Sequence, residues 1–140
     1  MKKQKIKTQD LIEKTCLLLK KRYVKDIEKH HAVVAASVLS KSGKVYTALN
    51  IGTYQPSIAT CAEIAAIGMG HTAEKDFEID TIVAMRDLPS YVISPCGKCR
   101  EYISDYGPKA KVVMPDDSKK GWHEVNIIDL IPGKYVKKVK

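Results

Sequence analysis

The chain has 140 residues, of which 44% are hydrophobic and 29% charged, and its formal net charge is +8 at pH 7. No apolar run reaches membrane-spanning length and no signal-peptide core is found, so we expect a single cytoplasmic domain over residues 1–140 and no membrane partner. The charge permits nucleic acid binding without requiring it, because lysines gather at both ends, where we expect basic, partly frayed tails at 1–7 and 136–140.

The first predicted element is an amphipathic helix at residues 8–23. Thr8 is a suitable N-cap, and Ile12, Cys16 and Leu19 recur at helical spacing after it. Cys16 therefore lies on the apolar stripe of this helix, and we expect it to be a small core residue without a chemical role.

Two stretches rich in β-branched residues follow, at 32–40 and 44–51, and the Ser-Gly pair between them predicts a hairpin turn. A stretch with glycine and proline at 52–60 predicts a loop. The remaining predicted elements are a helix at 61–74, a strand at 81–85, a loop at 88–95, a helix at 97–106, a strand at 110–115, and a short strand or helical turn at 124–133. Because β-α-β units pair their strands in parallel, the order predicts a three-layer α-β-α domain with a mixed sheet.

Three of the four cysteines fall where a loop enters a predicted helix. Cys96 and Cys99 are three residues apart and share one helix face, and Cys-x-x-Cys is a common half of a zinc site. Cys61 begins the preceding helix, so two helix N-termini could direct three thiolates at one spot and stabilise their charge. Since a catalytic zinc has three protein ligands and keeps one position for water, the pattern favours a catalytic site over a closed one.

Glu63 lies two residues after Cys61 at the same helix start. A carboxylate beside an activated water can carry its proton to a substrate, so we expect Glu63 to be a proton carrier and not a ligand. Two alternatives are a four-cysteine zinc knot and a redox Cys-x-x-Cys pair. The knot requires a fourth ligand that the sequence does not offer, and the redox pair explains neither Cys61 nor Glu63.

The motifs TCAEIAAI (residues 60–67) and SPCGKCREYISDYG (94–107) resemble those of the cytidine deaminase family of zinc hydrolases, as do VVAASVLSKSGKVYTALNI (33–51) and DLIPGKYV (129–136). The resemblance implies a sheet of about five strands between helices and one Zn²⁺ per subunit. It also implies a homo-oligomer, a tetramer or else a dimer. The residues it assigns are the zinc ligands Cys61, Cys96 and Cys99, the acid and base Glu63, and the substrate-binding residues Asn50 and Tyr135.

Two departures from the family pattern bear on the substrate. Gly52 stands where cytidine deaminases usually carry a glutamate that holds the ribose, and Ile64 stands where they carry an arginine that offsets thiolate charge. The missing arginine matches the blasticidin-S deaminase-like branch, and Arg100 is a candidate for the charge-balancing role. The resemblance therefore implies hydrolytic deamination, at C4, of a free pyrimidine nucleoside or analogue such as blasticidin S, cytidine or deoxycytidine.

Two other functions are compatible with parts of the sequence. A nucleic-acid deaminase would fit the positive charge, but it requires aromatic and basic residues along a groove, and the chain has only seven tyrosines, one tryptophan and one phenylalanine. A structural zinc or redox protein without turnover would fit the cysteines alone. The basic residues crowd the termini, which disfavours the nucleic-acid deaminase, and Glu63 with an open coordination position disfavours the structural or redox protein. Both remain alternatives to the deaminase of free nucleosides.

Overall fold

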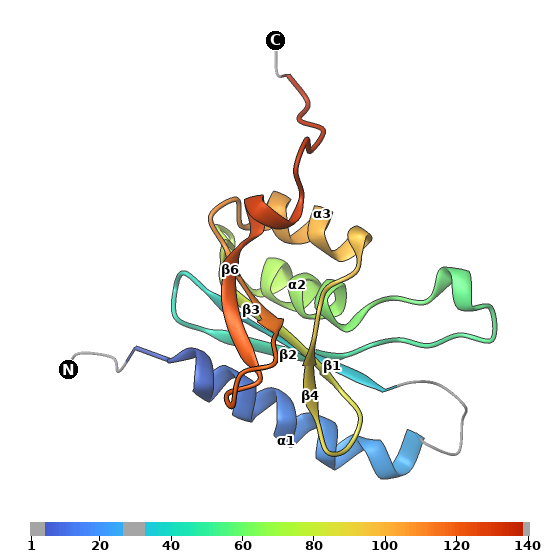
Figure 1. Cartoon of the computed structure of the whole chain (residues 1–140). Coiled ribbons are helices and arrows are strands. Elements are labelled where there is room, and N and C mark those ends of the chain that lie inside the picture. Colours follow the sequence, from blue (N-terminus) through green and yellow to red (C-terminus); the bar gives the residue numbers. More distant parts are fainter. Residues whose placement is uncertain (1–4, 27–32, 139–140) are drawn as a thin grey trace.

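The computed structural model describes residues 5–26 and 33–138, and within them the chain forms three helices and six strands (Figure 1). The helices are α1 (Thr8–Asp26), α2 (Ala62–Ala73) and α3 (Gly97–Tyr106). The strands are β1 (Val34–Ser40), β2 (Val45–Leu49), β3 (Ile79–Arg86), β4 (Tyr91–Ile93), β5 (Lys111–Pro115) and β6 (Trp122–Asn126). Two short 3₁₀ turns, η2 (Pro56–Ile58) and η3 (Ile127–Leu130), complete the described elements.

The strands form one mixed sheet in the order β2-β1-β3-β5-β6. Strand β1 pairs antiparallel with β2 and β3, β3 pairs in parallel with β5, and β5 pairs antiparallel with β6. The short strand β4 pairs antiparallel with the end of β3. The predicted hairpin is therefore confirmed, and so is parallel pairing across the β3-α3-β5 unit, whereas β1 separates β2 from β3.

The helices cover the two faces of the sheet, which confirms the three-layer prediction (Figure 1). On one face α1 packs Leu11 and Leu19 against a cluster that includes Val83 and Val113. On the other face α2 and α3 contribute Ile67 and Ile103 to a second cluster that includes other residues of β1, β3 and β5. Because both faces are covered, the central strands carry nearly continuous apolar runs.

The start of α1 differs from the predicted cap. The helix already includes Thr8, and the backbone N–H of Lys7 donates to the Asp10 carboxylate at 2.8 Å. The Thr8 hydroxyl instead donates to Glu124, which joins the helix to β6. Cys16 packs against the core cluster of this face as predicted, and its thiol lies 3.0 Å from the Ser90 hydroxyl.

The C-terminal half holds two further differences. The stretch at 88–95, predicted to be a loop, contains β4, because three residues there pair with the end of β3 and bury Val92. The stretch at 124–133 holds both of its predicted alternatives, the last residues of β6 and then η3. The expected tails at 1–7 and 136–140 lie partly outside the described residues. None of the helices in the described part of the chain is long and apolar enough to cross a membrane.

Candidate metal centre

The start of α2 places two chemically active side chains at one end of the helix. Cys61 is the N-cap residue, with an extended backbone (φ −65°, ψ 150°), and its side chain makes no capping hydrogen bond. Its carbonyl accepts the first helical bond from Ala65 at 3.1 Å. Glu63 is the second residue of the helix and is buried, with 5% of its surface exposed. The backbone at the helix start therefore sets the position of the Cys61 thiol, which makes no capping bond to the helix.

The start of α3 repeats this arrangement. Cys96 is the N-cap residue (φ −67°, ψ 167°), again without a side-chain capping bond, and its carbonyl accepts from the backbone N–H of Arg100 at 3.0 Å. Cys99 is the third residue of the helix and is fully buried. The two helix starts thus supply three thiols, and the positive end of each helix dipole favours their charged form.

The three thiols converge on one point. The Sγ atoms of Cys61 and Cys96 are 3.9 Å apart, those of Cys96 and Cys99 are 3.6 Å apart, and all three lie within 4.8 Å of one another. A tetrahedral zinc ion with Zn–S bonds of about 2.3 Å requires sulfur atoms about 3.8 Å apart. The donor set and its spacing therefore fit a zinc ion, and all four cysteines of the chain are free thiols.

The thiols influence one another electrostatically. Burial is the main cause that raises the pKa of Cys61 and of Cys99, and for Cys99 the charge of Glu63 adds to it. Burial also raises the pKa of Cys96, but hydrogen bonds with Cys99 and Cys61 lower it by more, so that the net shift is downward. The raised pKa values favour the neutral thiols of Cys61 and Cys99, and a divalent cation bound between the sulfur atoms would favour their thiolate forms instead.

Glu63 lies beside this cluster in a poorly hydrated place. Burial raises the pKa of its carboxyl group, while a hydrogen bond with the Cys99 thiol acts in the opposite direction. A buried carboxyl group next to a candidate metal position is a common arrangement for proton transfer.

A cavity of about 290 Å³ opens beside the thiols. It is lined by Val34, Asn50, Pro56, Ala59, Thr60, Cys61, Ala62, Glu63, Ile93 and Cys96. Asn50 follows β2 directly, and its side-chain oxygen accepts from the backbone N–H of Val34 at 2.8 Å. This bond fixes Asn50 at the wall of the cavity, so four of the predicted site residues border one space.

Two predicted site residues lie elsewhere. The Arg100 guanidinium donates to the carbonyls of Pro95 and Leu130 and to the Ser94 hydroxyl, so its described hydrogen bonds do not reach a thiol. Tyr135 is 80% exposed and lines a different hollow, between α3 and the C-terminal segment.

The structure also explains one departure and adds one residue. Ile64 packs against the core cluster of α2 and α3, so an apolar side chain fits this position. Ile93 of β4 also lines the cavity, and this residue was not identified from the sequence. The only sequence signal for it was the short apolar run in which it lies.

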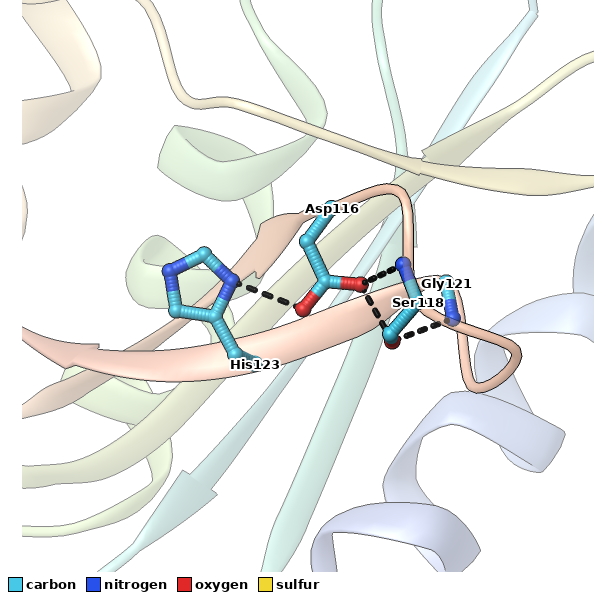
Figure 2. Close-up of polar contacts among 4 residues, drawn as sticks. All are labelled: Asp116, Ser118, Gly121 and His123. Atoms are coloured by element: carbon cyan, nitrogen blue, oxygen red, sulfur yellow. Dashed lines mark hydrogen bonds and ion pairs between the residues drawn. The ribbon is translucent and has the colours of Figure 1, made fainter.

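A second polar cluster lies at the turn between β5 and β6 (Figure 2). One oxygen of Asp116 accepts from the backbone N–H and the hydroxyl of Ser118, and the other lies 3.1 Å from Nδ1 of His123. The Ser118 hydroxyl also accepts from the backbone N–H of Gly121, at 3.3 Å, where a positive φ of 76° suits glycine. These bonds close the turn.

Comparison with known proteins agrees with the geometry. The family described as the cytidine and deoxycytidylate deaminase zinc-binding region matches residues 6–115. The blasticidin-S deaminase of Bacillus cereus is 40% identical over 117 residues, covering 78% of this chain and 79% of that protein. A probable cytidine deaminase of Dictyostelium discoideum is 31% identical over 110 residues, covering 74% and 68%.

Solved structures show the same fold. The cytidine deaminase of Burkholderia pseudomallei superimposes with a TM-score of 0.74 at 22% sequence identity, over 93% of this chain and 100% of that one. The cytidine deaminase of Bacillus anthracis gives the same TM-score at 21% identity, over 91% and 88%. At this level of identity the likeness concerns the arrangement of helices and strands.

Proposed function

The chain belongs to the cytidine and deoxycytidylate deaminase family, and from that membership we propose that it is a zinc-dependent deaminase of a free nucleoside or nucleoside analogue. As a family member it is a hydrolase that acts on C–N bonds. The proposed reaction replaces the amine at C4 of a cytosine-type base by a carbonyl group and releases ammonia. The observation that carries the proposal is the convergence of three thiols on one point, beside a cavity that Cys61, Cys96 and the buried Glu63 line.

In this proposal Cys61, Cys96 and Cys99 hold one Zn²⁺ ion per subunit. Their number leaves one coordination position for a non-protein ligand, as in catalytic zinc sites. When bound, the ion supplies Lewis-acid chemistry, because it lowers the pKa of water towards neutrality.

Glu63 moves the protons of the reaction. It takes one from water and delivers it to N3 of the base, and it then transfers a proton to the leaving amine. The water oxygen becomes the new carbonyl oxygen, and the C4–N bond breaks as ammonia leaves, so the atoms balance as one water consumed and one ammonia released. Asn50 borders the same cavity and contacts the sugar or its equivalent.

Blasticidin S is the favoured substrate, ahead of cytidine and deoxycytidine. The identity of 40% to the Bacillus cereus blasticidin-S deaminase supports it, and so does the apolar packing of Ile64, where cytidine deaminases carry an arginine. Gly52 removes the carboxylate expected to hold a ribose. Among the described residues that line the cavity none is cationic, which disfavours a polynucleotide substrate.

The assembly and location follow as part of the same proposal. A homo-oligomer, a tetramer or else a dimer, would allow Tyr135 of one subunit to approach a neighbouring site, since Tyr135 lies away from the cavity of its own subunit. The cytoplasm keeps thiols reduced and is the compartment we assign to a three-thiolate site.

The direct test is a side-by-side assay of zinc-loaded protein with blasticidin S, cytidine and deoxycytidine, followed by ultraviolet absorbance and by ammonia release. We expect turnover of at least one of them and the highest kcat/KM for blasticidin S. A zinc-containing protein that releases ammonia from none of the three would overturn the proposed substrate class.

A further inference from the structure

Arg100 joins three segments of the chain next to the candidate metal centre. Its Nε donates to the carbonyl of Pro95, its Nη1 to the carbonyl of Leu130 and its Nη2 to the Ser94 hydroxyl, each at 3.0 Å. We propose that Arg100 is a positioning residue for Cys96: its guanidinium fixes the backbone that places the Cys96 thiol at the metal. This inference rests on the proposed role of Cys96 as a metal ligand.

Two of these bonds act on the residues that come immediately before Cys96. Pro95 is buried and Ser94 is exposed, and both lie on the connection between β4 and α3. The backbone N–H of Arg100 also donates to the Cys96 carbonyl at 3.0 Å. The guanidinium therefore hydrogen-bonds to positions 94 and 95, directly before the N-cap residue Cys96, and restrains where the chain enters the helix.

The exposed position of Cys96 makes this restraint important. Cys99 is held by the buried face of α3, whereas Cys96 is exposed, precedes the first helical residue and makes no capping bond. Its thiol must nevertheless lie within bonding distance of a metal shared with a different helix. Burial restrains Cys99, whereas Cys96 is restrained by the β4–α3 segment that Arg100 holds in place.

The third bond connects the C-terminal segment to the same restraint. Leu130 is the last residue of η3, and its carbonyl, like those at other helix ends, has no partner within its own helix. The Lys134 ammonium binds Glu101 and Asp105 further along α3, so this part of the chain is held to the helix at two places. Of these two places, the one at Arg100 also bonds to the segment that carries Cys96.

The geometry requires arginine and not only a positive charge. The planar guanidinium directs donors to three acceptors from three separate nitrogens, and a lysine ammonium is a single point that cannot span them. Arg100→Lys therefore distinguishes positioning from charge compensation, because the lysine keeps the positive charge but lacks the planar set of donors. Ser94→Ala removes one acceptor and leaves the arginine in place.

The experiment compares Arg100→Ala, Arg100→Lys and Ser94→Ala with the wild type and with Arg86→Ala. Arg86 is a suitable control because it is an arginine whose guanidinium donates to the neighbouring Asp87, and it is not among the residues that line the cavity. Zinc affinity is measured by competition with a chromogenic chelator, and Co²⁺-substituted protein is examined for its sulfur-to-cobalt charge-transfer absorption. Circular dichroism at the same temperature shows that each variant is folded.

We expect both Arg100 variants to bind zinc about 10- to 100-fold more weakly and to show reduced charge-transfer absorption, as for other losses of support to a metal ligand. Ser94→Ala should weaken binding less, and Arg86→Ala should bind like the wild type. If Arg100→Ala does not fold, Arg100→Lys and Ser94→Ala decide the outcome.

Three results would overturn the inference. Wild-type zinc affinity in Arg100→Lys would assign the residue a charge role. A lower thermal midpoint with unchanged affinity and Co²⁺ spectrum would assign it a purely structural role, and equal effects of Arg86→Ala would make the change unspecific. A wild-type protein that binds no zinc would instead contradict the proposed function.

Discussion

Two clusters of side chains with catalytic or metal-binding groups lie in the described part of the chain. They differ in whether their polar atoms bond to one another or border a cavity. At the β5–β6 turn, Asp116, Ser118 and His123 direct their polar atoms at one another and at the turn backbone (Figure 2). At the starts of α2 and α3, the three thiols instead converge on one point, and Cys61, Cys96 and Glu63 border a cavity of about 290 Å³ beside it.

The contrast shows that residue types alone do not make a site. Aspartate, serine and histidine form a common catalytic combination, yet here the hydroxyl is bonded to the carboxylate and the His123 side chain is 51% exposed. The thiols come from two helices 35 residues apart, and their backbones hold them on one point. Convergence on a shared space distinguishes the candidate centre from the turn, and the predictions below test that distinction.

The largest effect is expected from Cys96→Ala. Removing one of three thiols should abolish stoichiometric zinc binding, reduce turnover to background and lower the thermal midpoint, because metal binding is coupled to folding. Zinc is measured by atomic emission on dialysed protein. Cys16→Ala is the control, since its thiol packs on the other face of the sheet and should retain zinc.

Glu63→Gln should separate metal binding from chemistry. The substitution preserves shape and removes the proton carrier, so zinc content should remain at the wild-type level while kcat falls by about 10²- to 10⁴-fold. Both quantities are measured on the same preparation. Wild-type turnover in this variant would show that Glu63 does not carry the proton.

Asn50→Ala tests the wall of the cavity. The variant loses the acceptor for the Val34 N–H and the proposed substrate contact, so KM should rise by up to about tenfold, as for one lost hydrogen bond. Zinc content should not change. Steady-state kinetics with the preferred substrate checks this, and an unchanged KM would remove Asn50 from the substrate site.

The smallest effects are expected at the β5–β6 turn. His123→Ala should leave zinc content and turnover unchanged and alter the free energy of unfolding by no more than about 1 kcal/mol, as is usual for exposed pairs. A marked loss of turnover would show that this cluster participates in the site.

The same turn has a pH dependence of predictable sign. The Ser118 hydroxyl, followed by its backbone N–H and His123, lowers the pKa of Asp116. A lowered pKa in the folded state adds stability above the ordinary carboxyl pKa, and that stability is lost as pH falls through the lowered value. Urea unfolding of Asp116→Asn at neutral and acidic pH should therefore show a deficit at neutral pH that shrinks on acidification.

Much of this organisation was predictable from local patterns. The hairpin, both β-α-β helices and the location of the cysteines at helix starts follow from periodicity and from the glycines and prolines between elements. Strand β4 was missed because only three residues pair, next to Pro89 and Ser90, and the pairing depends on where β3 ends. The Thr8 cap was wrong because its hydroxyl found a partner on β6, 116 residues away.

The candidate site likewise contains residues whose placement was predictable from the sequence and residues whose placement was not. Spacing places Cys61, Cys96 and Cys99 at helix starts, and the distances between their sulfur atoms then agree with a shared ion. The partners of Arg100 could not be predicted, because one of them, the Leu130 carbonyl, becomes a neighbour only when η3 packs against α3. Tyr135 likewise matched a motif, but its surroundings depend on how the C-terminal segment packs against α3.

Zinc K-edge X-ray absorption of the purified wild-type protein tests the central claim most directly, because it counts the sulfur atoms around the ion. We predict one zinc per chain with three sulfur neighbours at about 2.3 Å and one lighter neighbour. Four sulfur neighbours, or a zinc held by nitrogen and oxygen alone, would contradict the convergence of the two helix starts on an open metal centre.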